Sequence, residues 1–152
     1  MARVYLKGLP QLKAKLKRLK EQTAPDLKPT FEAAAQKIVD MMQRRVPVHT
    51  GALRDSIGWT WGDRPKYSQK VASVKAGENL VITIFAGNAN VRYAHLIEFG
   101  TKPHEQGGQF AGTMHPGTAP QPFFFSSYRA MRKEVKAMLR KAIKEAVKKA
   151  VA

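Results

Sequence analysis

The most regular pattern in the chain is LKPTFEAAAQKIVDMMQRRVP, residues 27–47. Its apolar side chains return every three or four positions, which places them on one face of an α-helix. They are Leu27, Phe31, Ala34, Ala35, Ile38, Met42 and Val46. Because a proline disfavours helical conformation in the residue before it, Pro47 predicts that this core helix ends near Arg45.

The segment before the core helix predicts a separate basic helix. Its leucines recur at helical spacing, and lysines and arginines fill the positions between them. The segment Thr23–Pro29 contains two prolines and predicts an interruption. We therefore expect a basic amphipathic helix within residues 1–22 and a single domain over residues 23–152. The leucines are Leu9, Leu12, Leu16 and Leu19.

The pattern changes to that of β-structure after the core helix. Trp59–Trp61 predicts a short strand, and residues 71–76 and 80–86 predict a hairpin closed by Gly77-Glu78-Asn79. Residues 80–86 are apolar on both faces, which indicates cover on both sides by helices or by a neighbouring subunit.

Glycine and proline dominate residues 100–120, which predict a long loop. A loop of this length is usually functional, or lacks structure until it meets a partner. Residues 124–150 then predict a basic C-terminal helix with one apolar stripe. The expected fold class is α+β: a small antiparallel β-sheet packed against the long core helix and the C-terminal helix, with the basic N-terminal helix added.

The net charge of +16 is concentrated at the two ends. Residues 1–20 hold seven basic and no acidic side chains, and residues 129–152 hold nine basic and two acidic ones. Such ends meet nucleic acid, an acidic protein surface or anionic lipid, or they simply keep two helices in solution. The expected basic surface comprises Lys13, Lys17, Lys20, Arg140, Lys144 and Lys148.

No constellation of catalytic or metal-binding residues emerges. The chain has no cysteine, no apolar run long enough to span a membrane and no signal-peptide pattern, so we expect it to fold in the cytoplasm. His95 and Glu98 would share a helical face, but no second histidine follows at the spacing of a zinc site. No serine lies in a nucleophile elbow, and no phosphate-binding glycine loop is present. We expect neither enzymatic activity nor a cofactor.

Three short segments are more specific than the composition. They are VPVHTGALRDSI (residues 46–57), YAHLIEFGT (residues 93–101) and HPGTAPQPFF (residues 115–124). In this order they resemble the tail-component family of long-tailed phages and prophages, a group of head–tail joining and tail-completion proteins. The resemblance covers residues 25–140. The chain departs from it in having His49 where aspartate is usual, and Phe124-Phe125-Ser126 where Leu-Arg-Pro is common.

The resemblance implies a structural protein of the virion neck that is assembled in the host cytoplasm. Such a protein would form a closed ring of six subunits, as a tail terminator, a tail-completion protein or a head-closure protein. It would contact the tail tube protein on one side and the connector or stopper proteins of the head on the other. The basic ends would face acidic partners or, less favourably, the DNA in the channel, because dense positive charge would retard DNA transit. The alternative is a basic nucleic-acid-associated protein that shares these turns.

Several residues are candidates for contacts between subunits or with partners. Glu98 would form a surface ion pair, or a pair across subunits with Arg54 or Arg92. Three consecutive phenylalanines cannot all face one core, so we expect at least one of them to meet another chain. The candidate interface residues are Arg54, Arg92, Glu98, Phe99, Phe123, Phe124 and Phe125.

Overall fold

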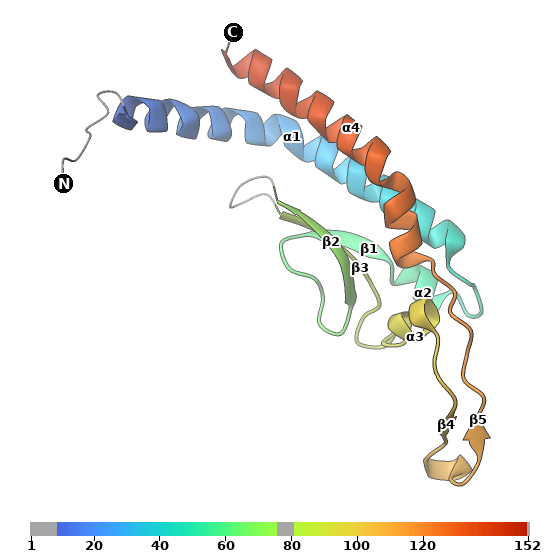
Figure 1. The fold of residues 1–152 in the computed structure, drawn as a ribbon. Helices are drawn as coiled ribbons and strands as arrows, with labels where there is room; N and C mark the ends of the chain where they lie inside the picture. The colour runs from blue at the N-terminus through green and yellow to red at the C-terminus, as the bar shows by residue number, and fades with distance from the viewer. Residues whose placement is uncertain (1–8, 76–80, 152) are drawn as a thin grey trace, which may run out of the picture.

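The computed structural model describes residues 9–75 and 81–151, with side chains except at residues 9, 10, 12, 20 and 70–75. Its main elements have the mixed α+β composition that the sequence predicts (Figure 1). In chain order they are α1 (Leu9–Arg45), α2 (Ala52–Asp55), β1 (Gly58–Trp61), β2 (Gln69–Lys75), β3 (Val81–Ala86), α3 (Ala94–Phe99), β4 (His104–Glu105), the 3-10 helix η1 (Gly108–Phe110), β5 (Met114–His115) and α4 (Phe124–Val151).

The long helix α1 runs without a break through both prolines, so the interruption predicted at Thr23–Pro29 is wrong. Pro25 and Pro29 are exposed, whereas the opposite face continues the buried stripe through Thr23 and Leu27. A proline in a helix removes a backbone hydrogen bond and bends the axis, and α1 is visibly curved (Figure 1). Packing of the buried face compensates for that loss. The boundary expected between residues 22 and 23 therefore lies inside one helix.

The core lies where α1 meets α4 and the sheet. All seven apolar residues of the predicted core stripe are buried, as are Val135 and Ala146 of α4. The two helices are antiparallel, and ion pairs join them at two levels: Lys37 with Glu134 (2.5 Å) and Asp26 with Lys149 (2.9 Å). The N-terminal end of α1 and the C-terminal end of α4 diverge (Figure 1).

The predicted strands are confirmed and form an antiparallel sheet in the order β1-β3-β2. Residues 76–80, which comprise the predicted turn and one end residue of each predicted strand of the hairpin, lie outside the described part of the chain. One face of the sheet packs on α1, where the indole Nε1 of Trp59 donates to Gln36 and that of Trp61 to Glu32 (both 2.9 Å).

The central strand β3 contacts other parts of its own chain on both faces. Ile82 and Ile84 are paired with the two tryptophans of β1, on the face that meets α1. On the other face Thr83 is also buried, and its hydroxyl donates to the carbonyl of Gly62 in the loop after β1 (2.6 Å). The predicted cover of the second face is therefore present only in part, because Val81 and Phe85 are half-buried there. A loop supplies it, and not the predicted helix or neighbouring subunit.

Residues 100–120 form a projecting antiparallel arm (Figure 1), so the expectation of an irregular loop is corrected. Thr101 pairs with Thr118 at its base, and β4 pairs with β5 further out. The turn η1 closes its tip. Glycine and proline content therefore concealed a hairpin, because strands of two residues carry almost no periodic signal.

Candidate functional site

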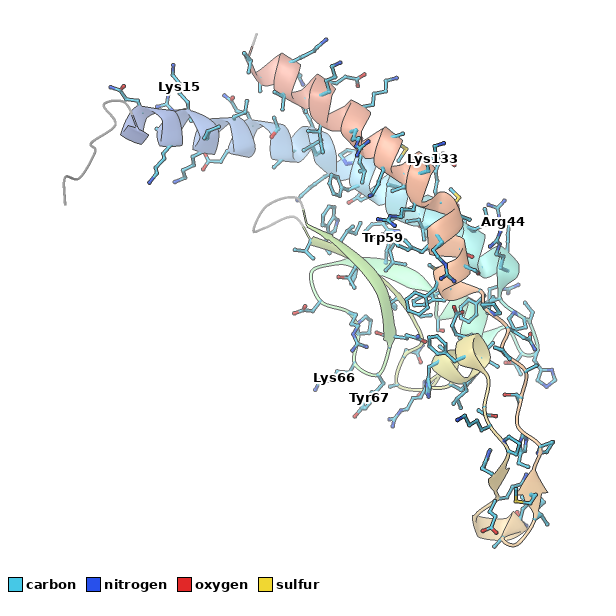
Figure 2. All side chains as sticks on the ribbon, in the orientation of Figure 1. Lys15, Arg44, Trp59, Lys66, Tyr67 and Lys133 are labelled. Carbon is cyan, nitrogen blue, oxygen red and sulfur yellow. The ribbon has the colours of Figure 1, made fainter. Side chains whose placement is uncertain are left out.

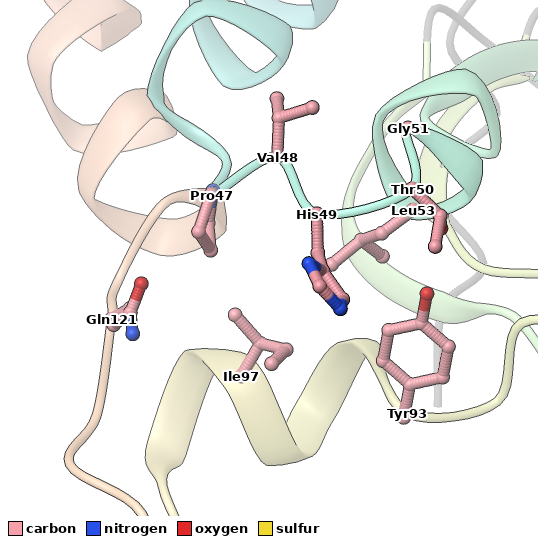
Figure 3. A pocket seen from close by; sticks show the side chains of 9 residues that line it. All are labelled: Pro47, Val48, His49, Thr50, Gly51, Leu53, Tyr93, Ile97 and Gln121. Carbon is pink, nitrogen blue, oxygen red and sulfur yellow. The ribbon is translucent and has the colours of Figure 1, made fainter.

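The three segments that distinguish the sequence meet at one place, at the base of the arm. The turn before α2, the helix α3 and the approach to α4 surround a pocket of about 240 Å³ (Figure 3). Its lining is mostly apolar and contains no lysine, arginine, aspartate or glutamate. The lining residues are Pro47, Val48, His49, Thr50, Gly51, Leu53, Tyr93, Ile97 and Gln121.

Glu98 ties the second segment to the third. Its side chain is buried, and its carboxylate accepts hydrogen bonds from three consecutive backbone N–H groups at the start of α4. Oε2 accepts from Phe123 and Phe124 (both 2.8 Å), and Oε1 accepts from Phe125 (3.0 Å). These N–H groups have no partner within their own helix, and a negative charge there is further stabilised by the helix dipole. Glu98 is thus the N-terminal cap of α4, supplied from another helix.

This role corrects the expectation that Glu98 forms an ion pair. Arg54 pairs instead with its neighbour Asp55 (3.1 Å). Arg92 donates to the carbonyl of Ala89 (2.9 Å), and its guanidinium lies 4.0 Å from the ring centroid of Tyr67. A buried carboxylate needs donors on every side, and the open end of α4 provides them.

The sequence before α4 gives an indication that its cap comes from elsewhere in the chain. The residues that lead into α4, Pro120-Gln121-Pro122-Phe123, include none of the serine, threonine, aspartate or asparagine residues that usually cap a helix. The first turn of α4 also contains no acidic residue. The first N–H groups of such a helix bond to water or to a distant acceptor, and Glu98 is the acid nearest to them in the three segments.

The phenylalanine run divides between the core and the surface. Phe123 and Phe124 are 1% and 0% exposed, so they are core residues and the expectation that they form an interface is corrected. Phe125 is half-buried and its ring lies 5.9 Å from that of Phe99, which is 61% exposed. Of the three consecutive phenylalanines, Phe125 is therefore the one that leaves aromatic surface uncovered.

The base of the arm is held on both sides. The backbone N–H of Gln121 donates to the carbonyl of Ile97 (2.8 Å), one residue before Glu98. Thr101 and Thr118 exchange two backbone hydrogen bonds (3.0 and 3.1 Å). Gly100 and Gly117 have φ angles of +70° and +83°, and a Cβ on either would collide with the backbone of the opposite strand. The arm therefore leaves the body in a fixed direction.

Ser56 ties the first segment to the sheet. Its buried hydroxyl donates to the carbonyl of Leu53 (2.7 Å) and accepts from the backbone N–H of Gly87, directly after β3 (3.1 Å). Ser56 lies in the segment VPVHTGALRDSI, but nothing in that segment indicates a partner 31 residues later in the chain.

Basic side chains project from both long helices, among them Lys15 on α1 and Lys133 on α4 (Figure 2). Lys13 and Lys17 are exposed on α1, and Arg140, Lys144 and Lys148 are exposed on α4. The side chain of Lys20 is outside the described part of the structure. The two charged ends of the sequence are thus on adjacent helices.

The described residues contain no group of three or more histidine, aspartate or glutamate side chains that could hold a metal ion. His104 and His115 face each other across the arm with their rings stacked, 5.2 Å between centroids. None of the described helices combines the length and apolarity needed to span a membrane.

Comparison with families of known proteins finds a match over most of the fold described above. The family model described as "Bacteriophage HK97-gp10, putative tail-component" matches residues 11–100, which is more than half of the chain. The matched region runs from α1 through α3 and includes Glu98, whereas the arm and the third segment follow it. No curated protein and no solved structure matches the chain.

Proposed function

We propose a role at the head–tail junction of the virion for this chain, which belongs to the HK97-gp10-like family of bacteriophage tail components. In this role it is a structural ring protein, of the tail-terminator or tail-completion type, that joins the tail tube to the connector of the capsid. Six copies would form the ring. It has no catalytic activity and no cofactor.

The main support for this proposal is the fixed arm, at whose base the three segments meet. Glu98 and the carbonyl of Ile97 hold the residues that follow the arm, and paired threonines close its base. The buried polar groups of this junction are used for hydrogen bonds within the fold. An arrangement of this kind positions a projection for contact with another molecule.

The diverging helix ends supply a second surface for partners. Leu16, Leu19 and Val151 line a groove there, with Lys15 and Arg18 on the same lining. Leu16 is 56% exposed, and Val151 is 73% exposed. Apolar residues bordered by positive charge suit a protein partner with an acidic rim, such as a component of the tail tube or connector.

The ring is tested by native mass spectrometry of the purified protein. We expect closed assemblies of one defined subunit number, with six as the value proposed here. The physical reason is that an arm and a receiving surface on one subunit form a heterologous contact, which closes into a ring when the rotation allows it. Monomers at all concentrations would contradict ring formation by the protein alone.

The alternative function, a nucleic-acid-associated protein, is favoured by one observation. Exposed lysines and arginines lie on two adjacent helices, so both charged ends could contact one duplex. Binding through phosphates weakens steeply as salt concentration rises. Monomers that coat DNA with such a salt dependence would favour this alternative over the ring.

A further inference from the structure

The tip of the arm carries no charge and exposes two large apolar side chains, although the protein as a whole is strongly basic. Residues 106–114, QGGQFAGTM, contain no ionisable side chain. Phe110 and Met114 are 62% and 63% exposed there. The tip is nevertheless ordered by its own hydrogen bonds, because Thr113 donates to the carbonyl of Phe110 through its hydroxyl (2.7 Å) and its backbone N–H (3.2 Å). A phenyl ring is thus presented at the end of a fixed projection.

The pocket at the base of the arm matches this tip in size and in its lack of lysine, arginine, aspartate and glutamate. Its volume of about 240 Å³ is ample for one ring, since a protein cavity of about 150 Å³ accommodates benzene. Leu53, Tyr93 and Ile97 contribute apolar surface to it (Figure 3). Val48 also lines the pocket and is 59% exposed. Like the tip, the lining has no lysine, arginine, aspartate or glutamate.

The tip and the pocket of one chain cannot meet. Ile97 and Gln121 line the pocket and flank the base of the arm. The seven residues from Thr101 to the turn at Gly108 extend the arm by roughly 20 Å at the rise of a β-strand. The paired base and the ladder between β4 and β5 prevent the arm from folding back.

We propose that the pocket receives the arm tip of a second copy of this chain, with Phe110 as the inserted side chain. Two copies that each carry a net charge of +16 repel each other, so a contact between them is favoured where neither surface carries lysine or arginine. The tip and the pocket are both surfaces of this kind, whereas the lysine-bordered groove at the helix ends suits an acidic partner. The inference rests on the proposed ring, for which it supplies the heterologous contact.

Cross-linking between single-cysteine chains tests this contact, because the natural sequence has no cysteine. One chain carries Val48→Cys at the pocket and the other carries Ala111→Cys beside Phe110; both positions are exposed. Mixing the two under oxidising conditions, or with a short bifunctional maleimide, is expected to give heterodimer several-fold above a control. The control pairs Ala111→Cys with Ala137→Cys, an exposed position on α4. Mixing separate chains excludes a bond within one chain.

A further variant separates insertion from simple proximity. Adding Phe110→Ala to the Ala111→Cys chain is expected to reduce the heterodimer to the level of the control, with the thermal melt of the chain unchanged because Phe110 is outside the core. Rings in the native mass spectrum without the Val48–Ala111 product would overturn this contact and leave the proposed function standing. Monomers without the product would overturn both the contact and the ring.

Discussion

Replacing Glu98 by alanine is expected to lower the free energy of unfolding by about 3–5 kcal/mol. The change leaves three backbone N–H groups at the start of α4 without their acceptor, in a buried position. It also removes the negative charge that stabilises this end of the helix dipole. For a domain of this length the melting temperature falls by roughly 10 °C, measured by circular dichroism or calorimetry.

Two controls show whether the cap is the cause. Glu98→Gln keeps one acceptor oxygen but turns an NH₂ group towards the third N–H, so its loss should be smaller than that of Glu98→Ala and still measurable. Glu145→Ala removes the same charge from an exposed position on α4 and should change the stability little. Equal melting temperatures for Glu98→Ala and Glu145→Ala would show that the cap does not stabilise the fold.

Replacing Phe124 by alanine is expected to cost about 3–5 kcal/mol, because it leaves a cavity at a side chain with no exposed surface. Phe125→Ala is the matched comparison. It removes the same atoms from the next residue, whose ring is only half-buried against Phe99, and its loss should be clearly smaller. Urea denaturation of both variants measures the difference.

The ring assembly gives the same pair of variants a second readout. If the phenylalanines acted at an interface, as the sequence alone indicated, Phe124→Ala would weaken oligomers and leave the melt of the monomer unchanged. Because Phe124 is buried, we expect Phe124→Ala to lower the melting temperature of the monomer itself. Any loss of oligomers would then follow from the loss of folding stability. A stable Phe124→Ala monomer would contradict the placement of this side chain in the core.

Periodicity in the sequence was sufficient for the framework of the fold. The stripe from Leu27 to Val46 and the strands around Trp59 and Ile84 carry many apolar residues at regular spacing, and their buried faces follow directly. The interruption predicted from Pro25 and Pro29 is wrong because proline's low helix preference is a local effect. Packing of the opposite, buried face of α1 outweighs it. Tertiary contact overrides such preferences when enough apolar area is buried.

The candidate site could not be predicted in the same way, because its hydrogen bonds join residues that are far apart in the chain. The carboxylate of Glu98 reaches residues 123–125, and Ser56 reaches Gly87. Burial of Phe123 and Phe124 depends on the direction in which α4 starts, which this remote cap sets. The three segments could be recognised separately in the sequence. Only the structure shows that they meet at the base of one arm.

Deletion of the gene from its phage or prophage tests the central claim, a structural role at the head–tail junction, most directly. Particles from the deletion strain are examined by electron microscopy, with and without the chain supplied from a plasmid. We expect DNA-filled heads and separate tails in the deletion strain, with joined particles restored by the plasmid. Joined, infectious particles at normal yield without the chain would contradict it.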